Sequence, residues 1–107
     1  MGVVLITNLE KRFSTEMKNI YVKADRECGY RATRFLQVLA ERGGVGAAKS
    51  LINKPGGTEG FTTLWELGRL DLSVEALVIR DEFKSLFTDE EREMCKNRLK
   101  DYGYSSK

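Results

Sequence analysis

"NLEKRFSTEMKNIYVKADREC", residues 8–28, places apolar side chains three and four positions apart, which is the spacing of one face of an α-helix. The apolar positions are Leu9, Phe13, Met17, Ile20, Ala24 and Cys28. By helix geometry this stripe extends over about five or six turns. Asn8 is suited to cap the start of such a helix, and Gly29 supplies the left-handed residue that commonly ends one. We therefore predict one long helix over these residues.

The rest of the chain repeats the helical spacing in shorter segments. Gly43-Gly44 interrupts it, and residues 53–60 (NKPGGTEG) hold the only proline and are typical of a loop. In "TDEE", Thr88 and Glu91 have the spacing of a capping box. The expected further helices are residues 31–42, 45–52, 60–68, 73–80 and 88–102, and the apolar spacing predicts that Leu36 of the first and Tyr102 of the last are buried. We predict an all-α fold, a compact bundle of five or six short helices with the first helix longest. Residues 1–107 would form one domain, with residues 1–7 as a flexible or packed tail.

The composition excludes several kinds of chemistry. The 107 residues include no histidine, which removes Ser-His-Asp and Cys-His catalytic sites and histidine-based metal sites. Cys28 and Cys95 are far apart in sequence, so we expect two reduced thiols in a cytoplasmic protein and no zinc site. The apolar run at residues 3–6 is too short for a signal peptide or a membrane span. We expect no cofactor, no metal and no membrane association.

Two stretches look briefly like catalytic motifs. "GGVGAAKS", residues 43–50, lacks the glycine that a phosphate-binding loop needs directly before Lys49, and a predicted helix precedes it instead of a strand. The carboxylates of residues 80–84 faintly resemble those of a metal-dependent nuclease, but such enzymes carry them on adjacent strands. Helix capping explains residues 89–91 better. We therefore predict that the protein is not an enzyme.

The strongest candidate for a polar contact surface is Tyr30 with Arg31 and Arg34. Arginine binds carboxylate or phosphate in a bidentate manner, and an aromatic neighbour adds stacking. The net charge is only +2, which is weak evidence for nucleic acid. Two solvated arginines are the alternative interpretation.

A helix-turn-helix DNA-binding regulator is the alternative function, with helices at about 45–52 and 61–68. Arg69 would then lie on the reading helix and Lys49 would contact phosphate. The turn between the helices would be longer than usual, and the reading helix has one basic side chain balanced by Glu66. A small-ligand pocket lined by Tyr30, Phe61 and Trp65, with Arg69 as an anion anchor, is a third hypothesis. For Trp65 we favour core packing, and for Arg69 a structural ion pair.

Several short patterns occur in a fixed order between residues 30 and 102. They are Gly-Gly, Ala-Ala-Lys, Gly-Phe-Thr, Leu-Trp-Glu and Arg-Leu-Asp-Leu. In this order they resemble a family of small helical domains of bacteria and their phages, found alone or appended to nuclease-like or DNA-associated proteins. The resemblance implies a nucleic-acid or defence context and transfers no catalytic residue.

The sequence thus favours a non-enzymatic binding or accessory module that acts through protein–protein contacts. A protein is the preferred partner and DNA the second choice. Self-association as a homodimer, through the first helix or residues 3–6, is a further hypothesis.

Overall fold

Every regular element in the described part of the chain is a helix. The computed structural model describes residues 7–53 and 60–104. The α-helices are α1 (Asn8–Cys28), α2 (Thr33–Ile52), α3 (Phe61–Glu66), α4 (Val74–Val78) and α5 (Asp89–Asp101), with 3₁₀ helices η1 (Leu70–Leu72) and η2 (Asp81–Leu86). The prediction of an all-α fold is confirmed, and so is the prediction that the first helix is the longest.

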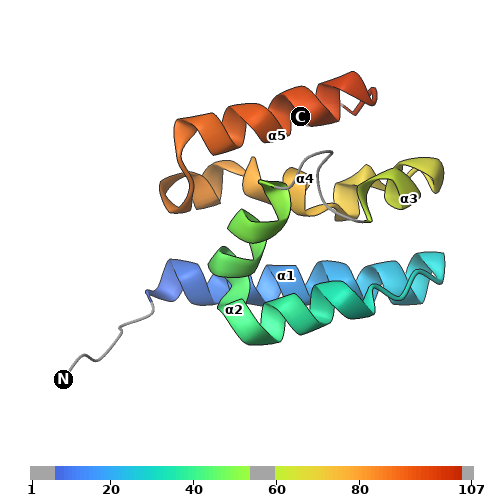
Figure 1. Cartoon of the computed structure of the whole chain (residues 1–107), viewed down its shortest axis with the longest axis horizontal. Coiled ribbons are helices and arrows are strands. Elements are labelled where there is room, and N and C mark those ends of the chain that lie inside the picture. Colours follow the sequence, from blue (N-terminus) through green and yellow to red (C-terminus); the bar gives the residue numbers. More distant parts are fainter. Residues whose placement is uncertain (1–6, 54–59, 105–107) are drawn as a thin grey trace.

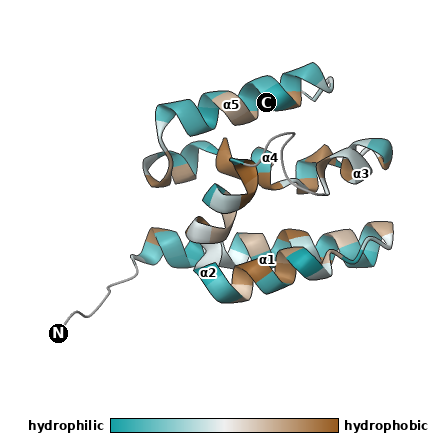
Figure 2. Ribbon diagram, in the orientation of Figure 1, coloured by the Kyte–Doolittle hydropathy of each residue, from teal (hydrophilic) through white to brown (hydrophobic). Residues whose placement is uncertain are grey.

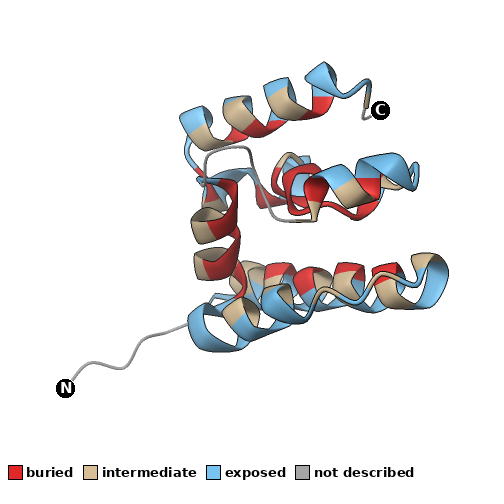
Figure 3. Cartoon of the chain, turned by 45° about the vertical axis from the view of Figure 1, so that its right-hand side comes forward, coloured by how far each residue is buried: buried red, intermediate tan, exposed pale blue. Residues whose placement is uncertain are grey.

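The helices form two outer layers with short elements between them. The hairpin of α1 and the first half of α2 makes one layer, and α5 makes the other (Figure 1). The segments α3, η1, α4 and η2 lie between these layers. The second half of α2 turns away from α1 and crosses toward α4 and α5, a course that is also visible in the turned view of Figure 3.

The start of α1 differs from the prediction by one residue. Thr7, not Asn8, is the N-cap: its side-chain oxygen accepts a hydrogen bond from the Glu10 N–H at 3.1 Å, and Glu10 Oε1 accepts one from the Thr7 N–H at 2.9 Å. A hydroxyl with a glutamate three residues later satisfies two orphan backbone donors, which Asn8 cannot do. Thr7 therefore belongs to the helix cap, and residues 1–6 of the predicted tail lie outside the described residues. Gly29 ends the helix with φ of 67°, as predicted.

Two of the three glycines inside α2, Gly43 and Gly44, have different structural roles. Gly43 has φ of 74° and ψ of 173°, a conformation that only glycine adopts readily, and it bends the helix. Gly44 is buried against α1, where its N–H donates to Ser14 Oγ at 3.1 Å and a Cβ would lie 2.6 Å from Ser14 Cα. The predicted break at Gly43-Gly44 is confirmed, although α2 begins at Thr33 and not at residue 31.

The core lies between the layers and is built on the stripe of α1. Phe13 is fully buried and meets Phe83 and Phe87 edge-to-face, with ring centroids 5.0 and 5.1 Å apart. All five residues of α4 are buried. The second half of α2 is among the most hydrophobic segments, whereas α5 is largely hydrophilic (Figure 2). Leu36, which we expected to be buried, is 39% exposed, because the first half of α2 packs mainly against α1.

A buried ion pair connects α5 to the elements beneath it. Glu75 of α4 is fully buried, and its Oε2 accepts a hydrogen bond from Arg98 Nη1 at 3.0 Å. The same arginine nitrogen donates to the Ile52 carbonyl at the end of α2, at 3.2 Å. Arg98 therefore joins α5, α4 and α2.

Candidate interaction surface

Two of the five predicted binding residues meet at one pocket. Tyr30, in the link between α1 and α2, is half-buried, and its ring lies so close to Gly60 that a Cβ there would be 2.7 Å from the Tyr30 hydroxyl. Arg34, in the first turn of α2, is exposed. Both side chains line an apolar pocket between α1, α2 and η1. Arg31 lies between them in sequence with 69% of its side chain exposed, and its Nε is 3.6 Å from Asp25 Oδ1.

The other two predicted binding residues hold the helices together elsewhere. Lys49 Nζ lies 2.8 Å from Glu91 Oε1 and 5.3 Å from the centre of the Phe87 ring, so it links α2 to α5. Arg69 Nη1 lies 2.8 Å from Glu27 Oε1 of α1, and its Nε lies 3.1 Å from Asp71 Oδ1. The hydrogen bonds that Arg69 donates to Asp71 and then to Glu27 raise its pKa. Both positions favour the structural interpretation of these basic residues.

The prediction that Trp65 packs in the core is wrong, because this side chain is 46% exposed. The helix α3 has only six residues, and its inward face is occupied by Phe61 and Leu64, which are buried. Trp65 follows Leu64 directly, so it falls about 100° around the helix and turns outward. Of the residues in the small-ligand hypothesis, Tyr30 lines the apolar pocket, whereas Phe61, Trp65 and the proposed anchor Arg69 do not.

Trp65 belongs to a surface that sequence reasoning missed. We define the aromatic patch as Trp65, Leu67 and Tyr102, whose side chains are 46%, 46% and 39% exposed. The rings of Trp65 and Tyr102 meet edge-to-face with centroids 5.3 Å apart, and Tyr102 also covers buried Phe61 at 5.0 Å. Tyr102 was predicted to be buried, but it caps the end of α5, where the bundle no longer encloses it. The brevity of α3, enclosed by glycines, was the one sequence signal for this surface.

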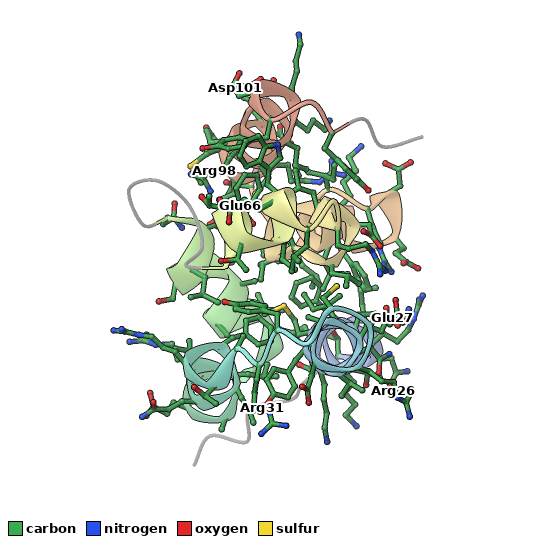
Figure 4. The ribbon with its side chains drawn as sticks, turned by 90° about the vertical axis from the view of Figure 1, so that its right-hand side faces the viewer. Arg26, Glu27, Arg31, Glu66, Arg98 and Asp101 are labelled. Atoms are coloured by element: carbon green, nitrogen blue, oxygen red, sulfur yellow. The ribbon has the colours of Figure 1, made fainter. Side chains whose placement is uncertain are left out.

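Charged side chains surround the end of the molecule that carries the patch. Figure 4 looks at this end, with Glu66, Arg98 and Asp101 in its upper half and Arg26, Glu27 and Arg31 in its lower half. Glu66 and Asp101 are exposed, whereas Arg98 is held by Glu75. The patch therefore has an apolar centre and charged surroundings.

The acidic side chains noted in the sequence form ion pairs between elements. Glu82 Oε1 lies 2.7 Å from Arg12 Nη2 of α1, and Asp81 Oδ1 lies 3.8 Å from Arg92 Nη2 of α5. Across residues 7–53 and 60–104, no three His, Cys, Asp or Glu side chains gather in a way that could hold a metal ion. Among the same residues, no helix combines the length and apolar character that a membrane span requires.

Comparison of the chain with known protein families, with curated proteins and with solved structures finds no match in any of the three. The resemblance to small helical domains of bacteria and phages therefore stays a prediction.

Proposed function

We propose that this protein is a non-enzymatic binding module that acts through protein–protein contacts at the aromatic patch. The main supporting observation is the exposure of Trp65 and Tyr102 side by side, and Leu67, two residues after Trp65, is exposed as well. Tryptophan and tyrosine are enriched among the residues that dominate binding energy at protein interfaces, since they offer a large rigid surface with one polar atom.

The surroundings of the patch support a protein partner. Protein interfaces commonly have an apolar centre and a polar rim, and exposed Glu66 and Asp101 lie at this end of the molecule (Figure 4). Three of the five large hydrophobic side chains that are exposed in the described part of the chain belong to the patch. The context of bacterial or phage nucleic-acid or defence systems is part of the proposal and rests on the resemblance alone.

The test is affinity capture from a bacterial lysate with the tagged full chain, with and without nuclease. We expect a protein partner that survives nuclease treatment and is lost with Trp65→Ala. Leu36→Ala is the matched control, because Leu36 is exposed to a similar extent on α2, away from the patch. Retention of the partner by Trp65→Ala would contradict the patch. Loss of every bound molecule on nuclease treatment would support the DNA-binding alternative.

The DNA-binding alternative receives no specific support from the positions of its basic residues. Lys49 and Arg69 are both engaged in ion pairs, and α3 ends at Glu66, so the proposed reading helix is shorter than residues 61–68. DNA therefore remains the second partner that the capture experiment examines.

The homodimer hypothesis is tested by measuring the mass of the particle in solution. Residues 3–6 lie outside the described residues, and Val22 on α1 is 41% exposed. Sedimentation should be compared for the full chain and for a chain that lacks residues 1–6 but keeps the Thr7 cap. Particles with the 12.2 kDa mass of one chain for the full-length protein would contradict self-association.

A further inference from the structure

A small apolar pocket lies beside α3, on the side away from Trp65. Its wall includes Ile20 and Ala24 of α1, Leu64 of α3, Leu72 of η1 and Val74 of α4, with Tyr30 and Arg34 as polar members. The pocket opens to the surface, and its volume is about 50 Å³. The wall is predominantly apolar, so the pocket favours an apolar group.

The volume decides the kind of occupant. Sites for drug-sized ligands and cofactors usually enclose about 300–1,000 Å³, and an engineered apolar cavity of about 150 Å³ binds benzene. A pocket of about 50 Å³ is too small for either and has room for the end of one aliphatic side chain. Such a group can enter from a chain that stays outside the pocket.

The charge near the pocket indicates the flanks of that chain. Among the described residues that line the pocket, Arg34 is the only charged one, and none is acidic. The two acidic side chains in the adjoining stretch 21–36 are both in ion pairs: Asp25 faces Arg31 at 3.6 Å, and Glu27 is 2.8 Å from Arg69. This excess of positive charge favours an acidic segment.

We propose that the pocket receives one aliphatic side chain, such as that of leucine or valine, from an acidic segment of a partner protein. The inference rests on the proposed function and specifies the partner's chemistry. Leu64 lines the pocket, and the next residue, Trp65, belongs to the aromatic patch, so the two surfaces lie on different sides of the same short helix.

The first experiment titrates the ¹⁵N-labelled full chain with three capped peptides and follows its amide signals. The peptides have the sequences Glu-Glu-Leu-Glu-Glu, Glu-Glu-Ser-Glu-Glu and Lys-Lys-Leu-Lys-Lys. We expect millimolar binding of the first peptide, with shifts at Ala24, Ala32 and Leu72, and at least five-fold weaker binding of the other two. Equal binding of the serine peptide, or shifts confined to other regions, would overturn the proposal.

Variants then locate the binding. Ala32→Leu adds volume at a half-buried wall position, and Arg34→Gln removes a charge at the pocket. Each variant should bind the peptide Glu-Glu-Leu-Glu-Glu at least three-fold more weakly than the parent chain does. Arg42 is an exposed residue of the same helix that does not line the pocket, so Arg42→Gln should leave the affinity for this peptide unchanged. Equal affinity of Arg34→Gln and Arg42→Gln would overturn the proposal even if Ala32→Leu does not fold.

The same variants separate this inference from the proposed function. A partner captured through Trp65 but equally well by Ala32→Leu and Arg34→Gln would overturn the pocket proposal and leave the aromatic patch in place. If no partner depends on Trp65, the proposed function fails, and the peptide titration still decides whether the pocket binds an acidic aliphatic segment.

Discussion

At the scale of single residues, the two cysteines are in different environments. Cys95 is fully buried in α5, and burial, followed by the negative charge of Glu75, raises the pKa of its thiol to about 12. Cys28, at the end of α1, is half-buried. Because the thiolate is the reactive form, we expect iodoacetamide at pH 8 to modify Cys28 in the folded protein and to spare Cys95 until the chain unfolds.

Mass spectrometry of the intact protein checks this prediction. A Cys28→Ser variant should take up no label when folded and one label in denaturant. Labelling of Cys95 in the folded protein at the rate of Cys28 would contradict the prediction.

Glu91 makes one contribution to the pH dependence of stability. Burial alone would raise the pKa of this carboxyl, but hydrogen bonds from Lys49, the Thr88 N–H and Asn53 hold it below the ordinary value of 4.5. A carboxyl whose pKa is lowered on folding stabilises the folded state above its unfolded pKa. This stabilisation is lost as pH falls from about 4.5 through the folded pKa.

The free energy of unfolding, measured with urea at pH 7 and at pH 3, should therefore fall less between these two pH values in Glu91→Gln than in the parent chain. Glu93→Gln, at an exposed position of the same helix, is the control. An unchanged pH effect in Glu91→Gln would contradict the role of this carboxylate.

At the scale of elements, the crossing of α1 and α2 depends on Gly44. An alanine Cβ there would lie 2.6 Å from the backbone Cα of Ser14, which cannot move without shifting α1. We expect Gly44→Ala to lower the free energy of unfolding by about 1–3 kcal/mol, the usual cost of overpacking. Gly46 is the matched control in the same helix, because its nearest neighbour to a new Cβ, Arg42 Cβ, lies at an ordinary 3.4 Å.

Gly46→Ala should raise the free energy of unfolding by about 0.5–1 kcal/mol, since alanine favours the helix over glycine. Chemical denaturation of both variants tests the contrast. Equal changes in the free energy of unfolding for the two substitutions would show that the close contact between Gly44 and Ser14 does not restrict the side chain at position 44.

The same elements show what the sequence can predict. Local signals such as the Thr88–Glu91 capping box and the Gly43-Gly44 break depend on residues close together in the chain, and both are confirmed. The exposure of Leu36 and Trp65 depends on whether another element covers the helix face, which periodicity cannot reveal. Tyr30 and Arg34 are near in sequence and do meet at one pocket. By contrast, Glu91, which binds Lys49, and Glu27, which binds Arg69 together with the nearby Asp71, come from distant segments.

At the scale of the whole molecule, the Glu75–Arg98 pair connects α5 to the buried α4 and to the end of α2. Glu75 is fully buried, and Arg98 contacts both its carboxylate and the end of α2. Removing one partner of a buried pair leaves a charge in the interior and typically costs about 3–5 kcal/mol. We expect Arg98→Met to lower the free energy of unfolding by about this amount, whereas Lys96→Met, at an exposed position of α5, should change it by less than about 0.5 kcal/mol.

The double variant separates the pair's net contribution from the cost of breaking it. With Glu75→Met and Arg98→Met together, no charge of the pair remains buried, and apolar replacement of such pairs is often neutral or stabilising. Urea unfolding of the parent, both single variants and the double variant should therefore show that the double variant recovers most of the stability that Arg98→Met loses. If the double variant instead loses the sum of the two single losses, the two side chains act independently. The connection of α4 to α5 and α2 would then rest on apolar packing rather than on this pair.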